Sequence, residues 1–488
     1  MFNVESLIFI IYLVLMLGIG IYFFVKGKAS SEKEYFLGGR KMGPWVSALS
    51  AGASDMSAWS LMGLPASVFA FGMGKTWIGV GLFIGYAISW MVEAPRLRRF
   101  TIVADDSITI PQYLTNRFKS TKSGLKITCA VIFLVAYTVY AASSMKACGT
   151  LLNTVTGMDQ SLAMYISTII IVGYTFLGGY NAVCVTDFIQ GMLMLLALLA
   201  APIAALAIIN NGGGVMTTAQ IASEVPGYFS FFNASWKDIV SGLGWGIGYF
   251  GMPHIIVRFM SLESHKSLKK SRVIAIVWTA IIIGFGCAVG TIGRLLLGDI
   301  ADSSTVFIQV VRYIFPAVVC GILLSAILAA AMSSADSQLL AASSAFASDV
   351  YKPIIRKNKA SDKEMNWAGR IVVIVISIIA VLIAANPNSG TVMSLVENAW
   401  GLFGAAFGPA IVMSLYWKRF NFAGATASII AGGLVDILWL AFLSGTGIYE
   451  IVPGAIAGIL AGVVVTLATK APSKEVEELF DKAVSYEG

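Results

Sequence analysis

The chain has 488 residues, of which 57% are hydrophobic and only 12% are charged, whereas soluble proteins carry about 25% charged residues. Long apolar stretches recur from end to end and leave no room for a separate soluble domain, so we expect an all-α integral membrane protein. The net charge of +7 does not indicate nucleic-acid binding, because the basic residues gather in loops between the apolar stretches.

Thirteen apolar stretches are long enough to cross a bilayer as helices, which takes about 20 residues each. A β-barrel is excluded, because its strands would be about ten residues long with alternating polarity. We therefore expect about 13 transmembrane helices in one domain, residues 1–470, and a short tail, residues 471–488. The stretches are residues 5–25, 44–72, 76–97, 125–153, 161–178, 182–209, 237–260, 272–296, 306–347, 367–385, 391–416, 421–443 and 448–469.

The basic residues lie in alternate loops. Loops 150–160, 386–390 and 444–450 contain neither Lys nor Arg. Because loops rich in Lys and Arg stay in the cytoplasm, we expect the N-terminus outside and the C-terminal tail inside. The basic segments hold 28 of the 33 basic residues and are 26–41, 96–126, 258–272, 352–370, 418–419 and 470–482.

Signatures of enzyme chemistry do not occur. The five cysteines are scattered singly, there are only two histidines, and no HExxH, GxSxG or Walker motif is found. Residues 246–251 match GxGxxG, but they lie inside an apolar stretch, whereas a dinucleotide site requires a preceding strand. We therefore expect a protein that is not an enzyme and that has no nucleic-acid partner and no obligate protein partner.

Two of the expected helices are interrupted. The stretch 44–72 contains the polar run Ser54-Asp55-Met56-Ser57, and the stretch 237–260 contains repeated glycines followed by Pro253, which weaken helical continuity. Broken helices at matching positions in two halves indicate an inverted-repeat transporter. We expect repeats over 44–209 and 237–416. Close helix packing is an alternative reason for the glycines, but it does not require an aspartate.

Acidic residues within expected spans are the strongest functional candidates, because a charge at the centre of a membrane helix costs roughly 2.5–3.5 kcal/mol. Asp55, Asp187 and Asp336 lie deep in their stretches. Asp336 also lies in a polar run, Ser333-Ser334-Ala335-Asp336-Ser337, whose oxygens suit a hard cation such as sodium. The alternative is that each serine bonds back to its own helix.

Other ionisable residues have plainer explanations. Glu93, Asp349 and Glu397 lie near the ends of their stretches, where contact with interfacial water is sufficient. Asp436 lies deeper but outside both repeats, and Lys146 has no assigned role. We interpret His254, beside Pro253, as structural rather than as a proton relay.

Long segments of the chain resemble the solute:sodium symporter family over nearly the whole length. They are AGASDMSAWSLMGLPASVFAFG from Ala51, TDFIQG from Thr186, GWGIGYFGMPHIIVRFM from Gly244, GILLSAILAAAMSSADSQLL from Gly321 and AWGLFGAAFGP from Ala399. The resemblance implies a LeuT-like fold of 13 helices, with one helix before two inverted five-helix repeats and two helices after them. It also implies a protein of the bacterial inner membrane.

The resemblance further implies a cation site and a group of coupling residues. Co-transported Na⁺ is expected at the carbonyls of Ala53, Met56 and Ala330 and the hydroxyls of Ser333 and Ser334. Coupling, or a second cation site, is expected at Asp55, Ser57, Asp187, Asp336 and Ser337. Relatives often carry two hydroxyls where this chain has Asp336 and Ser337, so the second site stays open.

The expected solute is L-proline, with another amino acid, a monocarboxylate, pantothenate or a sugar as the alternative. The resemblance implies a pocket of Trp59, Tyr140, Trp245, Tyr249 and Pro253. Aromatic walls suit an apolar ring and its ammonium, and free N–H groups at the start of a broken helix suit a carboxylate.

Overall fold

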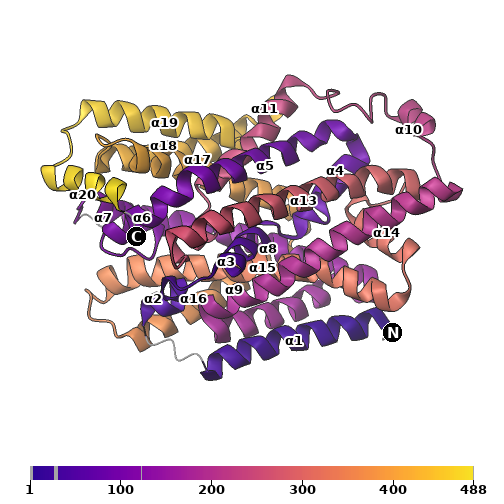
Figure 1. The fold of residues 1–488 in the computed structure, drawn as a ribbon, viewed down its shortest axis with the longest axis horizontal. Helices are drawn as coiled ribbons and strands as arrows, with labels where there is room; N and C mark the ends of the chain where they lie inside the picture. The colour runs from indigo at the N-terminus through magenta and orange to yellow at the C-terminus, as the bar shows by residue number, and fades with distance from the viewer. Residues whose placement is uncertain (1–3, 27–30, 122–123, 487–488) are drawn as a thin grey trace.

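A computed structural model describes residues 4–26, 31–121 and 124–486. Parts of the expected domain and tail, at residues 1–3 and 487–488, lie outside the described residues. The described chain is helical throughout (Figure 1), and its only β pairing is an isolated bridge between Met42 and Leu262. The expectation of an all-α protein is therefore confirmed.

Nine long helices make up most of the bundle, and shorter helices complete it. The long ones are α1 (Val4–Lys26), α8 (Gly124–Thr156), α9 (Gln160–Ile208), α13 (His265–Leu297), α15 (Ala317–Ala345), α16 (Asp362–Ala385), α17 (Val392–Tyr416), α18 (Phe422–Phe442) and α19 (Ile451–Ala468). The shorter ones are α2 (Glu32–Leu37), α3 (Pro44–Asp55), α4 (Gly63–Phe71), α5 (Trp77–Ile88), α6 (Ala94–Val103), α7 (Ile110–Arg117), α10 (Thr218–Glu224), α11 (Trp236–Gly244), α12 (Pro253–Ser261), α14 (Val306–Ile314) and α20 (Lys474–Ser485).

Ten helical segments of the described chain are long and apolar enough to cross a membrane. The other three expected spans differ from a simple helix. Spans 44–72 and 237–260 are interrupted, as the sequence predicts, and span 161–178 is a shorter apolar helix, Gln160–Phe176, which a break separates from the next span within α9. A kink at Gly179, with φ +62°, marks the boundary within α9. The number 13 stays a prediction.

Two interruptions follow directly from local sequence. The helix α3 ends at Asp55, and a short 3₁₀ turn at Ala58–Ser60 leads to α4. The helix α11 passes into a 3₁₀ segment, Trp245–Phe250, before α12 restarts. Pro253 suits the first turn of α12, because proline has no backbone N–H to leave unpaired there.

The expected span 306–347 is wrong at its beginning. The nine-residue α14 ends before Pro316, and the membrane-length helix α15 starts after it. Phe315 is extended, with φ −107° and ψ 150°, because the ring of a following proline disfavours the helical conformation.

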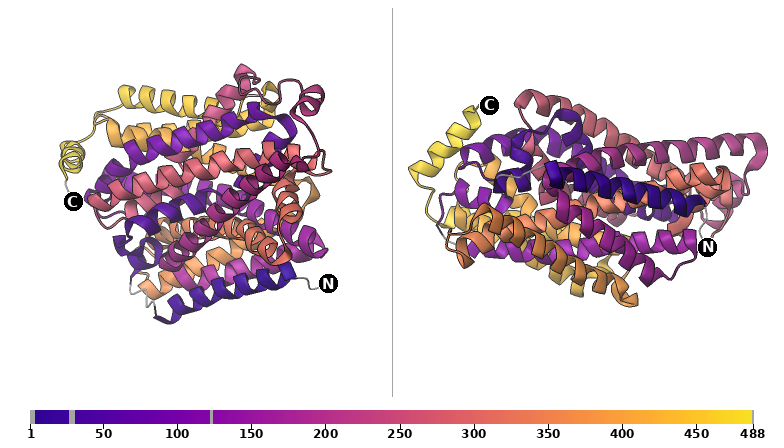
Figure 2. Two further views of the ribbon diagram at one scale, coloured as in Figure 1. Left: turned by 45° about the vertical axis from the view of Figure 1, so that its right-hand side comes forward. Right: turned by 90° about the horizontal axis from the view of Figure 1, so that it is seen from below.

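The two termini lie at opposite ends of the bundle (Figures 1 and 2). The end that carries α2, α6, α7 and α20 is here called the basic end, because Arg40, Arg98, Arg117 and Lys418 lie in or beside those helices. The other end, which carries the N-terminus, α10 and α14, is called the opposite end.

The basic end is closed over the interrupted helices. Met42, just before α3, pairs with the chain after α12, its N–H bonding Ser261 O at 3.1 Å. Arg40 donates to Met260 O at 2.6 Å and to Asp106 at 2.8 Å. Arg98, on α6, donates to the carbonyl oxygens of Leu262 and Glu263, both at 3.0 Å. These bonds hold the start of α3 and the helix α6 against the end of α12.

The opposite end is hollowed. One cavity of about 490 Å³ is lined by parts of α5, α11, α17 and the loop before α19, and another of about 510 Å³ by parts of α4, α8 and the start of α17. The protein is therefore closed at the basic end and hollowed at the opposite end.

Candidate functional site

The break after α3 lies against the serine run of α15. Ser333 donates its hydroxyl proton to Ala53 O at 2.8 Å and also lies 3.2 Å from Ala330 O. Ser334 is completely buried, and its hydroxyl oxygen has no hydrogen-bond partner among the described residues. Met56 caps α3 with a non-helical conformation, φ −76° and ψ 69°. Three of the five residues predicted for sodium, Ala53, Ala330 and Ser333, thus have oxygens in contact.

The two interrupted helices are linked through one buried carboxylate. Tyr249, in the 3₁₀ segment before α12, donates its hydroxyl proton to Asp55 Oδ2 at 2.6 Å, and Trp59 Nε1 donates to Asp55 O at 3.1 Å. Asp55 is fully buried, and its Oδ1 has no hydrogen-bond partner in the part of the chain that the structure describes. Ser57 closes the turn by accepting from Trp59 N at 3.5 Å. The free oxygen of Asp55 is available to a ligand.

The five predicted solute residues are all buried, and two of them, Trp59 and Tyr249, bond to Asp55 directly. Tyr140, whose hydroxyl has no protein partner, lies edge-on to His254 with ring centres 6.0 Å apart. Trp245 reaches Tyr249 through Trp400, which contacts both rings and donates to Trp245 O at 2.8 Å. The sequence prediction omitted Trp400, although it lies in the quoted AWGLFGAAFGP segment.

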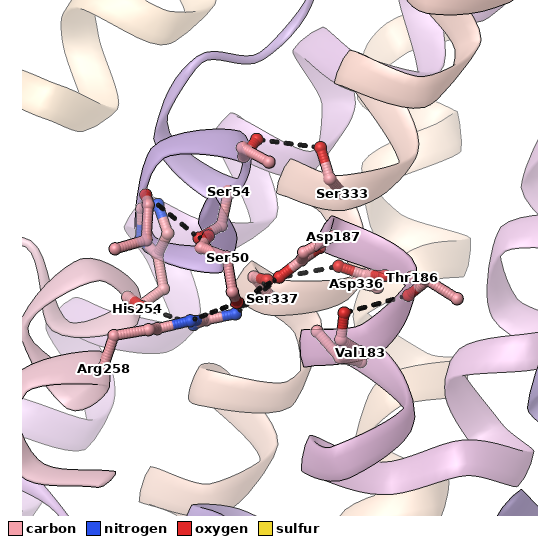
Figure 3. A network of polar contacts seen from close by, with 12 residues as sticks. Ser50, Ser54, Val183, Thr186, Asp187, His254, Arg258, Ser333, Asp336 and Ser337 are labelled. Atoms are coloured by element: carbon pink, nitrogen blue, oxygen red, sulfur yellow. Dashed lines mark hydrogen bonds and ion pairs between the residues drawn. The ribbon is translucent and has the colours of Figure 1, made fainter. Parts of the chain in front are cut away.

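A second group of polar residues lies deeper toward α9 (Figure 3). Asp187 Oδ2 accepts hydrogen bonds from Ser50 at 2.6 Å and from Arg258 Nη2 at 3.1 Å. The same Arg258 nitrogen donates to Ser337 Oγ at 2.6 Å, and Ser337 donates to Asp336 Oδ1 at 3.2 Å. Asp336 Oδ2 accepts from Tyr174 at 2.8 Å. A guanidinium therefore contacts one of the two predicted acidic residues directly and is linked to the other through Ser337.

Arg258 corrects the sequence analysis, which counted it among loop residues. It lies within α12, its side chain is 2% exposed, and it forms an ion pair with Asp187, which is fully buried. The spacing of His254, Arg258 and Ser261 places three polar residues on one face of an otherwise apolar helix. That pattern indicates a buried polar face and is the signal that the sequence analysis missed.

Two acidic residues assigned to interfacial water are instead buried. Glu93 is 1% exposed and accepts from Ser89 at 2.9 Å, while Asp349 is fully buried and accepts from Thr109 at 2.8 Å. Their hydroxyl partners, rather than water, compensate part of their burial. Lys146, which had no assigned role, donates to Ser389 at 3.1 Å and to Gly390 O.

His254 is buried, with its Nδ1 3.2 Å from the Tyr137 hydroxyl and its Nε2 without a hydrogen-bond partner among the described residues. Its backbone N–H donates to the Tyr137 hydroxyl at 2.8 Å, and the N–H groups of Ile255 and Ile256 bond to Met252 O. The first N–H groups of α12 are thus already engaged. Most N–H groups of the break between α3 and α4 are engaged as well, among them those of Met56, Ser57 and Ser60.

Interrupted helices around a buried, oxygen-lined centre define a helical membrane transporter. The model of the sodium:solute symporter family matches residues 35–432, and the chain belongs to that family. The osmoregulated proline transporter OpuE of Bacillus subtilis is 44% identical over 477 residues, which covers 96% of each chain. The sodium/proline symporter of Staphylococcus aureus is 41% identical over 486 residues, 97% of this chain and 94% of that protein.

Solved structures show the same fold. A Na⁺-coupled sialic acid symporter in a substrate-bound outward-open state aligns with a TM-score of 0.80 at 21% identity, over 97% of this chain and 99% of that one. MhsT in complex with L-phenylalanine aligns with a TM-score of 0.54 at 16% identity, over 88% of this chain and 99% of that one. The LeuT-like fold is confirmed, and the protein is a multi-pass membrane protein with bacterial transporter relatives.

Proposed function

We propose that this chain couples the entry of Na⁺ to the uptake of L-proline by alternating access. The observation that carries the proposal is the junction at which the α3–α4 break contacts both the serine run of α15 and the 3₁₀ segment before α12, through Ser333–Ala53 and Asp55–Tyr249. The two long relatives named as proline transporters support the choice of solute.

Sodium binds to the carbonyls of Ala53, Met56 and Ala330 and to the hydroxyls of Ser333 and Ser334 in this proposal. A hard cation prefers oxygen ligands, and the end of α3 supplies backbone carbonyls close to hydroxyls. Bound sodium replaces the hydrogen bond by which Ser333 now holds Ala53 O, and so keeps the break joined to α15.

Proline binds between the aromatic residues Trp59, Tyr140, Trp245 and Tyr249, beside Pro253. The rings bury the pyrrolidine ring, and an ammonium held over an aromatic face gains about 0.5–2 kcal/mol. Asp55, with one oxygen free, lies between the sodium and solute groups and couples them. The two repeats, residues 44–209 and 237–416, rock around the occupied centre.

We place the basic end in the cytoplasm and the N-terminus outside, because Lys and Arg are retained on the cytoplasmic side. The protein is then closed toward the cytoplasm and hollowed toward the outside, and solute enters from the outside.

The test is uptake of labelled proline into vesicles that contain the purified protein, with and without an inward sodium gradient. Removing one ligand in Ser333→Ala is expected to raise the sodium concentration for half-maximal uptake about tenfold, equivalent to about 1.4 kcal/mol. Ser325→Ala is the matched control, because Ser325 is also buried in α15 but bonds back to Gly321 O at 2.7 Å.

Uptake that persists unchanged when the sodium gradient is collapsed contradicts the coupling. If sodium drives no uptake of proline but does drive uptake of another amino acid, a monocarboxylate, pantothenate or a sugar, the result supports sodium coupling and contradicts proline as the solute. If Ser333→Ala and Ser325→Ala need the same sodium concentration for half-maximal uptake, the serine run is not part of the cation site.

A further inference from the structure

Basic side chains gather around the start of α13, at the basic end of the protein. Residues 262–272 contain four cations and a single acid, Glu263, whose carboxylate accepts a hydrogen bond from Ser267 at 2.6 Å. The first turn of α13 contains no acidic residue, and the positive end of the helix dipole repels cations there. Their own helix therefore does not compensate the four cations, which are Lys266, Lys269, Lys270 and Arg272.

These cations form no ion pair with any residue that the structure describes. The three lysines are exposed, and Arg272 makes one hydrogen bond, from its Nε to Trp90 O at 3.1 Å. Within the described chain, the two Nη nitrogens of Arg272 have no hydrogen-bond partner. A guanidinium with its outer nitrogens open suits the oxygens of a phosphate, to which it can donate two parallel hydrogen bonds.

The helix α6 adds positive charge to this group. The cations that lie close enough to His265 for their charges to act on it are Arg98, Arg99, Lys269 and Arg272. Among the described residues, Arg99 bonds to carbonyl oxygens and to no carboxylate. The electrostatic potential around the start of α13 is therefore positive, and it attracts an anion.

The same face of α13 continues into the membrane as an apolar surface. Lys266, Lys270, Val273 and Val277 follow one another at spacings of three and four residues, which places them on one face of the helix. Val273 and Val277 are more than half exposed, and α13 is long and apolar enough to cross a membrane. This face thus has a cationic part beside an apolar part, as the headgroup and the acyl chains of a lipid require.

The helix α5 lies side by side with α13 (Figure 1). Ile88 and Met91, at the end of that span, are exposed apolar residues close in sequence to Trp90. Because Arg272 bonds to Trp90 O, its guanidinium lies where the exposed apolar surfaces of the two spans meet. The cationic group is therefore at the edge of the lipid-facing surface and not in a loop distant from it.

We propose that the start of α13 is a binding site for an anionic phospholipid of the cytoplasmic leaflet. Lys269 and Arg272 bind its phosphate, and its acyl chains lie along Val273, Val277 and the exposed end of α5. Anionic lipids of that leaflet are attracted to basic residues beside membrane helices. The site rests on the proposed orientation, with the basic end in the cytoplasm, but it does not depend on which ion or solute is transported.

The test measures lipid binding to the purified full-length protein in a neutral detergent, by native mass spectrometry and by the Tm. The probes are dioleoylphosphatidylglycerol, which is anionic, and dioleoylphosphatidylcholine, which has the same acyl chains and no net charge. We expect phosphatidylglycerol to bind and to raise the Tm, and phosphatidylcholine to do neither at the same concentration, because only the first compensates the cations.

The charge of the site should determine the affinity. Lys269→Gln with Arg272→Gln removes two cations and is expected to weaken phosphatidylglycerol binding about thirtyfold. Lys269→Gln alone, which changes only an exposed side chain and leaves the Arg272–Trp90 bond intact, is expected to weaken it about fivefold. Lys269→Arg retains the charge and should retain the affinity of the wild type.

Lys359→Gln with Lys363→Gln is the matched control. It also removes two exposed cations at the basic end, in the loop and helix that follow Lys352, which forms an ion pair with Glu32 on α2. Acidic residues are present in the first turn of that helix, α16, so no uncompensated cationic group exists there. Binding of phosphatidylglycerol to this variant should equal that of the wild type.

Equal phosphatidylglycerol affinity of the two double variants overturns the site, as does equal binding of phosphatidylcholine and phosphatidylglycerol to the wild type. If glycerol 3-phosphate, which has the phosphate without the acyl chains, raises the Tm as much as the lipid at the same concentration, a soluble anion is the ligand and the lipid is overturned. Because binding is measured without transport, a protein that binds the lipid through Lys269 but accumulates no proline supports the site and contradicts the proposed function.

Discussion

At the scale of single residues, Arg258 changes the charge balance of the deeper polar group. Its guanidinium, bonded to Asp187 at 3.1 Å and Ser337 at 2.6 Å, stands where the resemblance left a second sodium site open. A fixed cation bonded to an aspartate and a hydroxyl leaves no need for a second sodium there. Asp55 and Ser333, by contrast, have no basic partner within their own group, and they remain available to a cation from solution.

Replacing Arg258 by methionine is expected to make the stability of the protein depend on a sodium ion bound beside Asp187. Removing one partner of a buried ion pair costs about 3–5 kcal/mol, because Asp187 and Asp336 then lie buried without a counter-charge. Sodium should partly replace the guanidinium. Each tenfold rise in the sodium concentration above its Kd then restores about 1.4 kcal/mol of the free energy of unfolding. The measurement is the Tm of the purified variant in increasing sodium against choline.

The double variant Arg258→Met with Asp187→Asn is the control, because it removes both charges of the pair and should lose most of the additional sodium dependence. A single variant whose Tm rises with sodium no more steeply than that of the wild type would show that the guanidinium does not occupy a cation site.

At the scale of elements, the closure of the basic end depends on side chains that join α6 to the end of α12. Arg98 donates two hydrogen bonds, each of 3.0 Å, to the carbonyl oxygens of Leu262 and Glu263. Its neighbour Arg99 instead bonds Pro95 O and Val484 O, on α6 and the tail helix. The two adjacent arginines thus make different hydrogen bonds, and of the two only Arg98 bonds to the end of an interrupted helix.

Arg98→Ala is expected to favour opening at the basic end. Hydrogen bonds to charged groups contribute about 1.5–3 kcal/mol, so losing the pair should raise the open population about tenfold or more. A cysteine introduced for Ala341, which lines a small cavity with Arg258 and Ser337, reports opening through its rate of labelling by a membrane-impermeant maleimide. Labelling is measured in a background without the five native cysteines.

Arg99→Ala should leave the labelling rate unchanged. Equal rates for Arg98→Ala and Arg99→Ala would show that the contacts of Arg98 do not hold the basic end closed.

The sequence predicts elements best where composition alone determines them. Polar residues and glycines marked both interruptions, and Pro253 marked the restart of α12, because these residues act on the backbone locally. The two expected spans within α9 are also separate, because Gly179, with φ +62° and ψ −169°, breaks the helix between them. The early end of α14 was missed, although Pro316 is the signal for it.

Site residues show the same limit. Ser333 and Asp55 could be predicted from polar groups in apolar stretches, since such groups are costly in lipid. Arg258 could not be separated from loop arginines by counting charges, because its burial depends on Asp187, which lies 71 positions away in the chain.

At the scale of the whole molecule, one sodium and a solute without net charge move one positive charge per cycle. Moving one charge through 100 mV contributes about 2.3 kcal/mol, and a tenfold sodium gradient contributes about 1.4 kcal/mol. Together they sustain a solute gradient of roughly 500-fold. A second sodium would double the free energy and raise that limit to the order of 10⁵-fold.

The number of sodium ions can therefore be read from the voltage dependence of accumulation. With the voltage of vesicles set by potassium and valinomycin, one charge per cycle predicts a tenfold change in the steady-state proline ratio for about every 60 mV, and two charges predict a hundredfold change. Because Arg258 already fills the place beside Asp187 and Ser337, we expect the tenfold slope for the wild type. A hundredfold slope would show that a second sodium moves with the solute, at oxygens other than those that the guanidinium holds.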